Sequence, residues 1–135
     1  MGHLRGLQGE RAQALVEYAL VLPILLLLLL GIMEFGIAVF NYNSIANAAR
    51  EGARYGIVHW RDADVIAGIE DAARRSTEGL DQAALDIVAT IDSTVARVVR
   101  VEVTYESQLL TGPIIAAVGG DPALNLSAVA TMQLE

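Results

Sequence analysis

The chain has 135 residues, of which 9 are Lys or Arg and 16 are Asp or Glu, so its net charge at pH 7 is −7. This acidic balance argues against nucleic-acid binding, because a protein that contacts phosphates needs a basic surface. The chain has no cysteine, which excludes a disulfide scaffold and any zinc or iron–sulfur site held by thiolates. Its length allows one small domain with an appended segment.

The hydrophobic residues are concentrated in one block near the N-terminus. Residues 19–33 carry no charge, and residues 18–40 contain a single charged side chain, that of Glu34. A helix over residues 18–40 is about 35 Å long, enough to cross a hydrocarbon core of about 30 Å. The rest of so short a chain cannot surround a helix that is apolar on every side. We therefore expect a transmembrane span at about residues 18–40.

The flanking charges predict the orientation of this span. Residues 1–12 carry two Arg and one Glu, whereas the chain after residue 40 carries 7 Arg and 13 acidic residues. Arg at the short N-terminal end favours a cytoplasmic N-terminus, with the larger part of the chain outside. Two alternatives remain open. One is a plain single-pass anchor, and the other is a secretory signal cut after residues 46–48 (Ala-Asn-Ala), although the apolar run is longer than such signals usually have.

A helical pattern continues beyond the apolar block to about residue 57. Ala48, Gly52 and Gly56 repeat every four residues and therefore lie along one side of the helix. Such small residues form a groove that lets another helix approach closely. The alternative is that this stripe packs against the protein's own sheet, and the sequence does not decide between the two. One helix from about residue 14 to 57 is about 65 Å long and projects beyond the bilayer.

The remaining residues predict a small α+β head. Asp62 or Asp64 can cap a second helix over about residues 64–76. The hydrophobic period then changes from helical to alternating in three segments, residues 85–92, 99–106 and 124–134. Residues 111–122 between the last two segments predict a short apolar helix or loop. Three half-buried strands predict an antiparallel sheet with its apolar face on the helices.

The sequence shows no pairing of a nucleophile with a base. Its two histidines, His3 and His59, belong to no metal-binding motif, and no phosphate-binding loop is present. We therefore expect no enzyme activity, no cofactor and no metal. The unusual polar residues are Glu17 and Glu34, which border or interrupt the apolar block. A carboxylate at the centre of a bilayer is unfavourable by about 2.5–3.5 kcal/mol, so each is expected either to have a partner or to lie at an interface.

Four motifs follow one another between Arg11 and Val58. They are QALVEYALVLP, a leucine run, GIMEFG (Gly31–Gly36) and NAAREGARYG (Asn47–Gly56). In this order and spacing they resemble the TadE-like family, the pseudopilins of tight-adherence (Tad) pilus systems, which are relatives of type IV pilins. The resemblance implies a pilin-like fold, a membrane-inserted precursor and a short basic leader that a prepilin peptidase removes on the cytoplasmic side.

The resemblance also implies where the leader is cut. In these families an acidic residue is fifth after the cut, and Glu17 in that place puts the cut between Ala12 and Gln13. Removal of 12 residues leaves 123 of the 135. The residue before the cut is usually Gly, and this chain has Ala12. The new amine of Gln13 is then a cation among apolar helices, and Glu17 of the same or a neighbouring subunit can neutralise it and set the register of packing.

Taken together, the sequence predicts an α+β protein with a leader (1–12), a long helix (13–57) and an extracytoplasmic head (58–135). The implied function is that of a minor pilin-like (pseudopilin) structural subunit of a Tad-type pilus or secretion apparatus. The expected partners are membrane lipid, the prepilin peptidase, other pilin-like subunits and the Tad assembly platform, with no nucleic acid. The alternatives are an uncut membrane-anchored component of the secretion machinery, which Ala12 favours, and a major filament subunit. The expected location is the cytoplasmic membrane and, after processing, an extracellular pilus.

Overall fold

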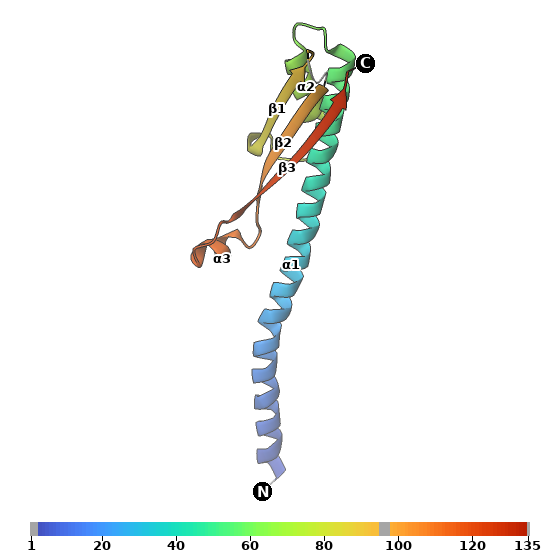
Figure 1. The fold of residues 1–135 in the computed structure, drawn as a ribbon. Helices are drawn as coiled ribbons and strands as arrows, with labels where there is room; N and C mark the ends of the chain where they lie inside the picture. The colour runs from blue at the N-terminus through green and yellow to red at the C-terminus, as the bar shows by residue number, and fades with distance from the viewer. Residues whose placement is uncertain (1–2, 95–97, 135) are drawn as a thin grey trace. The chain divides into compact units, whose positions relative to one another are not determined.

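The computed structural model describes residues 3–94 and 98–134, with side chains from residue 12 onward. The chain divides into two compact units, Met1–Phe35 and Gly36–Glu135. Figure 1 shows the elements in chain order: α1 (His3–His59), α2 (Val65–Arg75), the short 3₁₀ helix η1 (Gln82–Ala84), β1 (Leu85–Asp92), β2 (Val98–Gln108), α3 (Gly112–Ala117) and β3 (Ala123–Gln133). The elements that follow α1 form the head. The predicted α+β class, with a long N-terminal apolar helix, a second helix and a three-stranded antiparallel sheet, is confirmed.

Helix α1 begins earlier than the sequence pattern indicated. The expected start was about residue 14, whereas the structure has helix from His3 and continues it through Pro23 to His59. Once a helix has formed its first turn, each further residue that is fixed adds one hydrogen bond, and residues 3–13 contain no proline to stop it. The leader predicted over residues 1–12 is therefore helical from His3. Met1, Gly2 and the side chains of residues 3–11 lie outside the described part of the chain.

The end of α1 and the start of α2 follow from local contacts. The ring of His59 stacks on that of Tyr55 with 4.1 Å between centroids, and the carbonyl of His59 accepts a hydrogen bond from the backbone N–H of Asp62 at 2.8 Å. Asp64 occupies the N-cap position of α2, but its side chain makes no capping hydrogen bond. The expected side-chain cap is therefore wrong, because Asp64 has φ −105° and ψ 19° instead of the extended backbone that aims a capping oxygen at the helix.

The sheet has the strand order β1-β2-β3, with both pairs antiparallel. Near one end of the sheet, Val99 of the central strand β2 lies opposite Ile91 of β1 and Met132 of β3. The alternation predicted from the sequence holds, because Val99, Val101 and Val103 are fully buried while the residues between them are exposed or half-buried. The apolar face of the sheet packs on α2 and on the C-terminal part of α1, and together they form one core.

The stripe of small residues on α1 lies inside this core. Ala48, Gly52 and Gly56 are all buried. A Cβ placed on Gly56 would come within 2.7 Å of Val99 Cγ1 and 2.8 Å of Ile69 Cδ1, so glycine is required by the closeness of β2 and α2. The structure thus places the stripe against the chain's own sheet and second helix. The groove that the sequence offered to a second helix is already filled.

We predict that Gly56→Leu lowers the free energy of unfolding of the head by about 1–3 kcal/mol or more, because the added side chain overpacks the core. Gly36→Leu is the matched control on the same helix, since nothing lies within 4 Å of a Cβ at Gly36. The measurement is denaturant unfolding of the full chain in detergent micelles, followed by the emission of Trp60, which packs against the core. Equal stability of the two variants would contradict the packing of α1 described above.

Candidate functional site

The largest exposed apolar surface belongs to the first part of α1. Every side chain from Ala12 to Leu29 is exposed. The large hydrophobic residues in this stretch have between 47% (Leu25) and 74% (Tyr18) of their surface accessible. Within the described residues, one helix is long and apolar enough to cross a membrane, and it is this one. Full burial of one such side chain contributes roughly 1.5–3 kcal/mol, so this surface requires an apolar environment that the chain itself does not supply.

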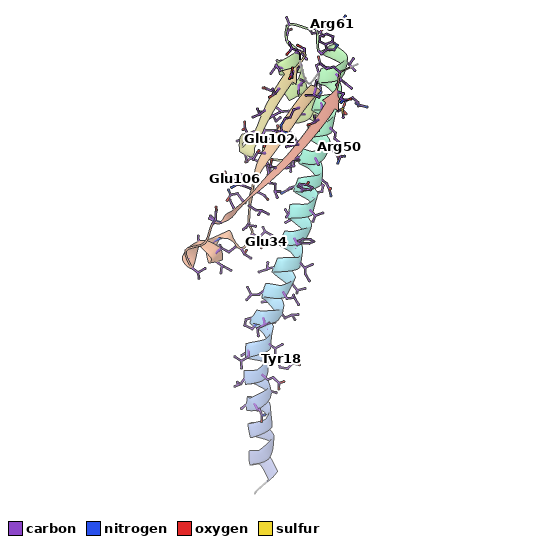
Figure 2. All side chains as sticks on the ribbon, viewed as in Figure 1. Tyr18, Glu34, Arg50, Arg61, Glu102 and Glu106 are labelled. Carbon is purple, nitrogen blue, oxygen red and sulfur yellow. The ribbon has the colours of Figure 1, made fainter. Side chains whose placement is uncertain are left out.

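Glu17 shares one face of this helix with apolar neighbours. Ala14, Glu17, Tyr18 and Val21 line a shallow concavity on the helix surface, and Tyr18 stands out from the helix in Figure 2. Gln13 is four residues before Glu17 and therefore lies on the same face, about 6 Å away along the axis. The structure thus brings together on one face the two residues that are predicted to meet after cleavage.

The predicted cleavage bond lies within helical backbone. Ala12 and Gln13 both belong to α1, and both side chains are exposed. The first four N–H groups of a helix have no partner inside it. A cut at this bond would therefore leave Glu17 in the first turns of the new helix, where a negative charge complements the helix dipole.

Glu34 differs from the residues on either side of it. Its side chain is half-buried, whereas those of Met33 and Phe35 are 57% and 72% exposed. Leu30, four residues earlier, is half-buried as well, so the two share a less exposed face of α1. Figure 2 labels Glu34 on this part of the helix.

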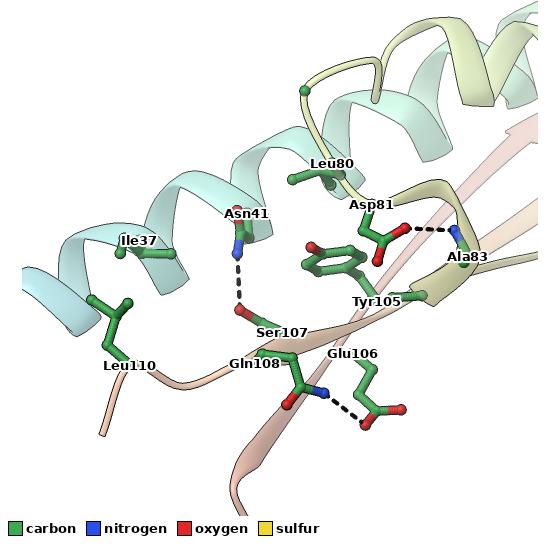
Figure 3. A pocket seen from close by; sticks show the side chains of 12 residues that line it. Ile37, Asn41, Leu80, Asp81, Ala83, Tyr105, Glu106, Ser107, Gln108 and Leu110 are labelled. Carbon is green, nitrogen blue, oxygen red and sulfur yellow. Dashed lines mark hydrogen bonds between the residues drawn. The ribbon is translucent and has the colours of Figure 1, made fainter. Parts of the chain in front are cut away.

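A cavity of about 650 Å³ lies where the C-terminal end of β2 meets α1. Its walls come from three segments: Ile37 and Asn41 of α1, residues 79–84 before β1, and residues 105–108 and 110 at the end of β2 (Figure 3). Two of these segments, α1 and the end of β2, are joined by a long-range hydrogen bond. Asn41 Nδ2 donates to Ser107 Oγ at 2.9 Å, and both residues are buried.

Polar groups around this cavity form hydrogen bonds with one another. Asp81 Oδ1 accepts the backbone N–H of Ala83 at 3.0 Å and so caps η1, and Gln108 Nε2 donates to Glu106 Oε1 at 3.3 Å (Figure 3). Among the described residues, no buried side-chain nitrogen or oxygen lacks a hydrogen-bond partner, and no three His, Asp or Glu gather as a metal site. The cavity walls are thus built by structural contacts.

Charged residues on the C-terminal part of α1 and on α2 pair locally at the surface. Arg54 donates two hydrogen bonds of 2.7 Å to Glu51, and this hydrogen bonding, followed by the charge of the carboxylate, raises the pKa of the guanidinium. Arg75 pairs with Asp71 at 2.6 Å in the same manner on α2. Exposed pairs of this kind are screened by water and contribute little to stability. They form solvated faces of two helices.

A protein-family model matches the greater part of α1. Residues 12–54 match the model of the family described as TadE-like protein. The N-terminal region of this chain is TadE-like. The TadE-like match covers about a third of the chain, includes Glu17, Glu34, Ala48 and Gly52, and ends inside α1 two residues before Gly56. A search of curated proteins and a search of solved structures found no match to the chain.

Two features of the structure were not predicted from the sequence. One is the bond between Asn41 and Ser107, which are 66 residues apart, so no local pattern connects them. The other is the exposure of the β2–β3 connection, which was expected only as a short apolar helix or loop. The sequence does contain an indication of this exposed apolar surface. Residues 109–120 carry no charge and contain five Leu, Ile or Val, a composition too apolar for an ordinary solvated loop.

We predict that Asn41 and Ser107 are energetically coupled. A double-mutant cycle with Asn41→Ala and Ser107→Ala is expected to give an interaction free energy of about 0.5–1.5 kcal/mol, because each single variant leaves the other polar group buried and unsatisfied. The readout is denaturant unfolding followed by Trp60 emission.

The matched control for this cycle uses the exposed hydrogen bond between Ser127 Oγ and Glu102 Oε1, at 3.3 Å. There we expect an interaction free energy near zero, since water replaces the lost partner. A coupling at Asn41–Ser107 no larger than this control would show that the bond does not hold α1 to the end of β2.

Proposed function

We propose that this protein is a minor pilin-like subunit that is inserted in the cytoplasmic membrane and assembled into a Tad-type pilus or secretion apparatus through α1. The observation that carries the proposal is the coincidence of the TadE-like match, residues 12–54, with the exposed apolar stretch of α1. A surface that is apolar on every side must meet lipid or other apolar helices. A precursor in a membrane meets the first, and a subunit in a filament meets the second.

The proposed role is structural, and two parts of α1 contribute to it in different ways. Residues 12–40 supply an apolar surface to lipid and to neighbouring subunits. The small residues after Asn41 are used inside the protein's own head. Assembly through α1 therefore depends on its N-terminal part, and the stripe at Ala48, Gly52 and Gly56 holds the head on the helix.

The proposed partners follow from the precursor's chemistry. A prepilin peptidase would cut between Ala12 and Gln13, and Arg near the N-terminus would keep that bond on the cytoplasmic side. The new amine of Gln13 adds a positive charge at the start of the helix. Glu17 on the same face would neutralise this amine, within one subunit or between two, and so fix how deeply neighbouring helices overlap. The Tad assembly platform would then receive the processed subunit.

Two other roles predict different outcomes. An uncut component of the secretion machinery would keep its leader and stay in the membrane, and the presence of Ala12 in place of Gly favours it. A major filament subunit would be processed in the same way but would be the principal protein of isolated filaments. Mass and abundance therefore separate the three roles.

We predict that co-expression with the peptidase of its own system shortens the protein by residues 1–12, so that Gln13 is the N-terminus. The measurement is the intact mass of the membrane-extracted protein, with Ala12→Gly as a matched variant that restores the usual residue before the cut. Full-length mass for both chains would contradict the proposal and support a permanent anchor. A new N-terminus at Ala49 would instead indicate a head released by signal peptidase.

We predict that Glu17→Gln reduces incorporation into filaments by at least about tenfold, because breaking an ion pair among apolar helices is unfavourable by about 3–5 kcal/mol. Glu78→Gln, at an exposed position of the head, is the control and is expected to assemble normally. The readout is the amount of tagged subunit in isolated filaments relative to the membrane. Normal assembly of Glu17→Gln would show that its carboxylate has no part in register.

A further inference from the structure

Most of the connection between β2 and β3, residues 109–120, is a loop without charge, and Asp121 follows it. Residues 109–120 read LLTGPIIAAVGG and include α3. Leu109 donates its backbone N–H to Pro122 O at 3.0 Å, which closes the base of the loop. After α3, Gly120 donates to Ile115 O at 2.9 Å, and Gly119 adopts φ +85°, a conformation that disfavours residues with a Cβ. The loop therefore has a defined shape.

This shape exposes the apolar side chains of the loop. Leu110, Ile114 and Val118 are 52%, 56% and 82% accessible. Figure 1 shows α3 standing beyond the end of the strands that it connects. A connection with a defined backbone that presents large apolar side chains to its surroundings marks an interaction surface, because solvated connections are normally polar.

The base of the loop is fixed beside the end of the apolar run of α1. Leu110 and Ile37 both line the cavity at the end of β2 (Figure 3). The hydrogen bond from Asn41 to Ser107 ties α1 to β2 just before the loop begins. A span that starts at Tyr18 and crosses about 30 Å uses about 20 residues and so leaves the hydrocarbon core near Ile37. The loop thus emerges from the head at the outer boundary of the bilayer.

Exposed apolar residues of α1 lie at the same boundary. Val39, Phe40 and Tyr42 are 43%, 62% and 49% exposed, and Tyr is enriched where a bilayer meets water. Exposed apolar residues of both α1 and the loop are therefore found near this boundary. Within residues 109–120 no charged side chain opposes contact with lipid.

We propose that residues 109–120 form a second membrane contact, which rests in the outer surface of the lipid bilayer beside the point where α1 leaves it. This proposal rests on the membrane anchoring proposed above. Lipid is the expected partner of the loop, because the loop lies at the boundary that the length of the span sets. The contact holds the head against the membrane before the subunit is extracted into a filament.

The test uses single-cysteine variants of the full chain, which contains no cysteine of its own. Val118→Cys carries a polarity-sensitive fluorophore in the loop. Val88→Cys is the matched control, an exposed valine that lies opposite Glu102 in the middle of the sheet. Leu27→Cys reports on the anchor itself. Each variant is reconstituted at low protein density in vesicles of phosphatidylcholine and phosphatidylglycerol, with and without lipids that carry a nitroxide quencher near the headgroup.

The lipid contact predicts a blue-shifted emission at Val118 and a loss of roughly half its intensity to the quencher lipids, with little change at Val88. Quenching at Leu27 without quenching at Val118 would overturn the loop contact and leave the anchor intact. The absence of quenching at Leu27 would overturn the anchor and, with it, both proposals. A blue shift at Val118 that grows with protein density and is insensitive to quencher lipid would overturn lipid as the occupant and assign the loop to a neighbouring subunit.

Discussion

Helix α1 must be compatible with two different environments, a protein core and an apolar exterior. The change from one kind of residue to the other lies near Asn41. On the C-terminal side, α1 buries Ile45, Ala48 and the residues that follow at helical spacing against the sheet and α2. On the N-terminal side, the side chains from Ala12 to Leu29 are exposed and, apart from Gln13 and Glu17, largely apolar. The head packs closely only because small residues let Val99 and Ile69 approach the backbone of α1. The fold of the head therefore depends on this one contact.

The sequence predicted most of the head because its periods are unambiguous. Strands β1, β2 and β3 begin and end within about one or two residues of the expected limits, since an alternating pattern has only one way to place its apolar side in a core. The burial of Ala48 and Gly52 was not decided, because small residues at four-residue spacing suit a second helix and a sheet equally well. The start of α1 was placed too late, since the pattern marks where the apolar residues begin and helical backbone extends beyond them.

The candidate site was predictable in its residues and not in its surroundings. Glu17 stands out in the sequence as a carboxylate at the edge of an apolar block, and the structure places it on one face with Gln13. What faces it in a membrane or a filament is another molecule, and the sequence of one chain does not contain that molecule. The contact of Asn41 with Ser107 was not predictable for a different reason, since it depends on the register of β2 against α1 and on no local pattern.

The structure suits the proposed role of a subunit that passes from lipid into a filament. The apolar stretch of α1 is compatible with both surroundings, because its side chains from Ala12 to Leu29 are exposed. The head, in contrast, satisfies its buried polar groups within the described residues. In the proposed assembly, a charge pair at the start of the helix would distinguish correct overlap between neighbours from sliding along an apolar surface.

The most direct test of this account is site-specific photo-crosslinking from Leu25, in the middle of the exposed apolar stretch, in cells that carry the complete pilus system. A benzophenone side chain at Leu25 is expected to form adducts with other pilin-like subunits when the peptidase is active. The same group at Thr90, on the exposed outer face of the sheet, serves as the reference position. Protein adducts from Thr90 and none from Leu25 would contradict assembly through α1 and would assign the apolar stretch to lipid alone.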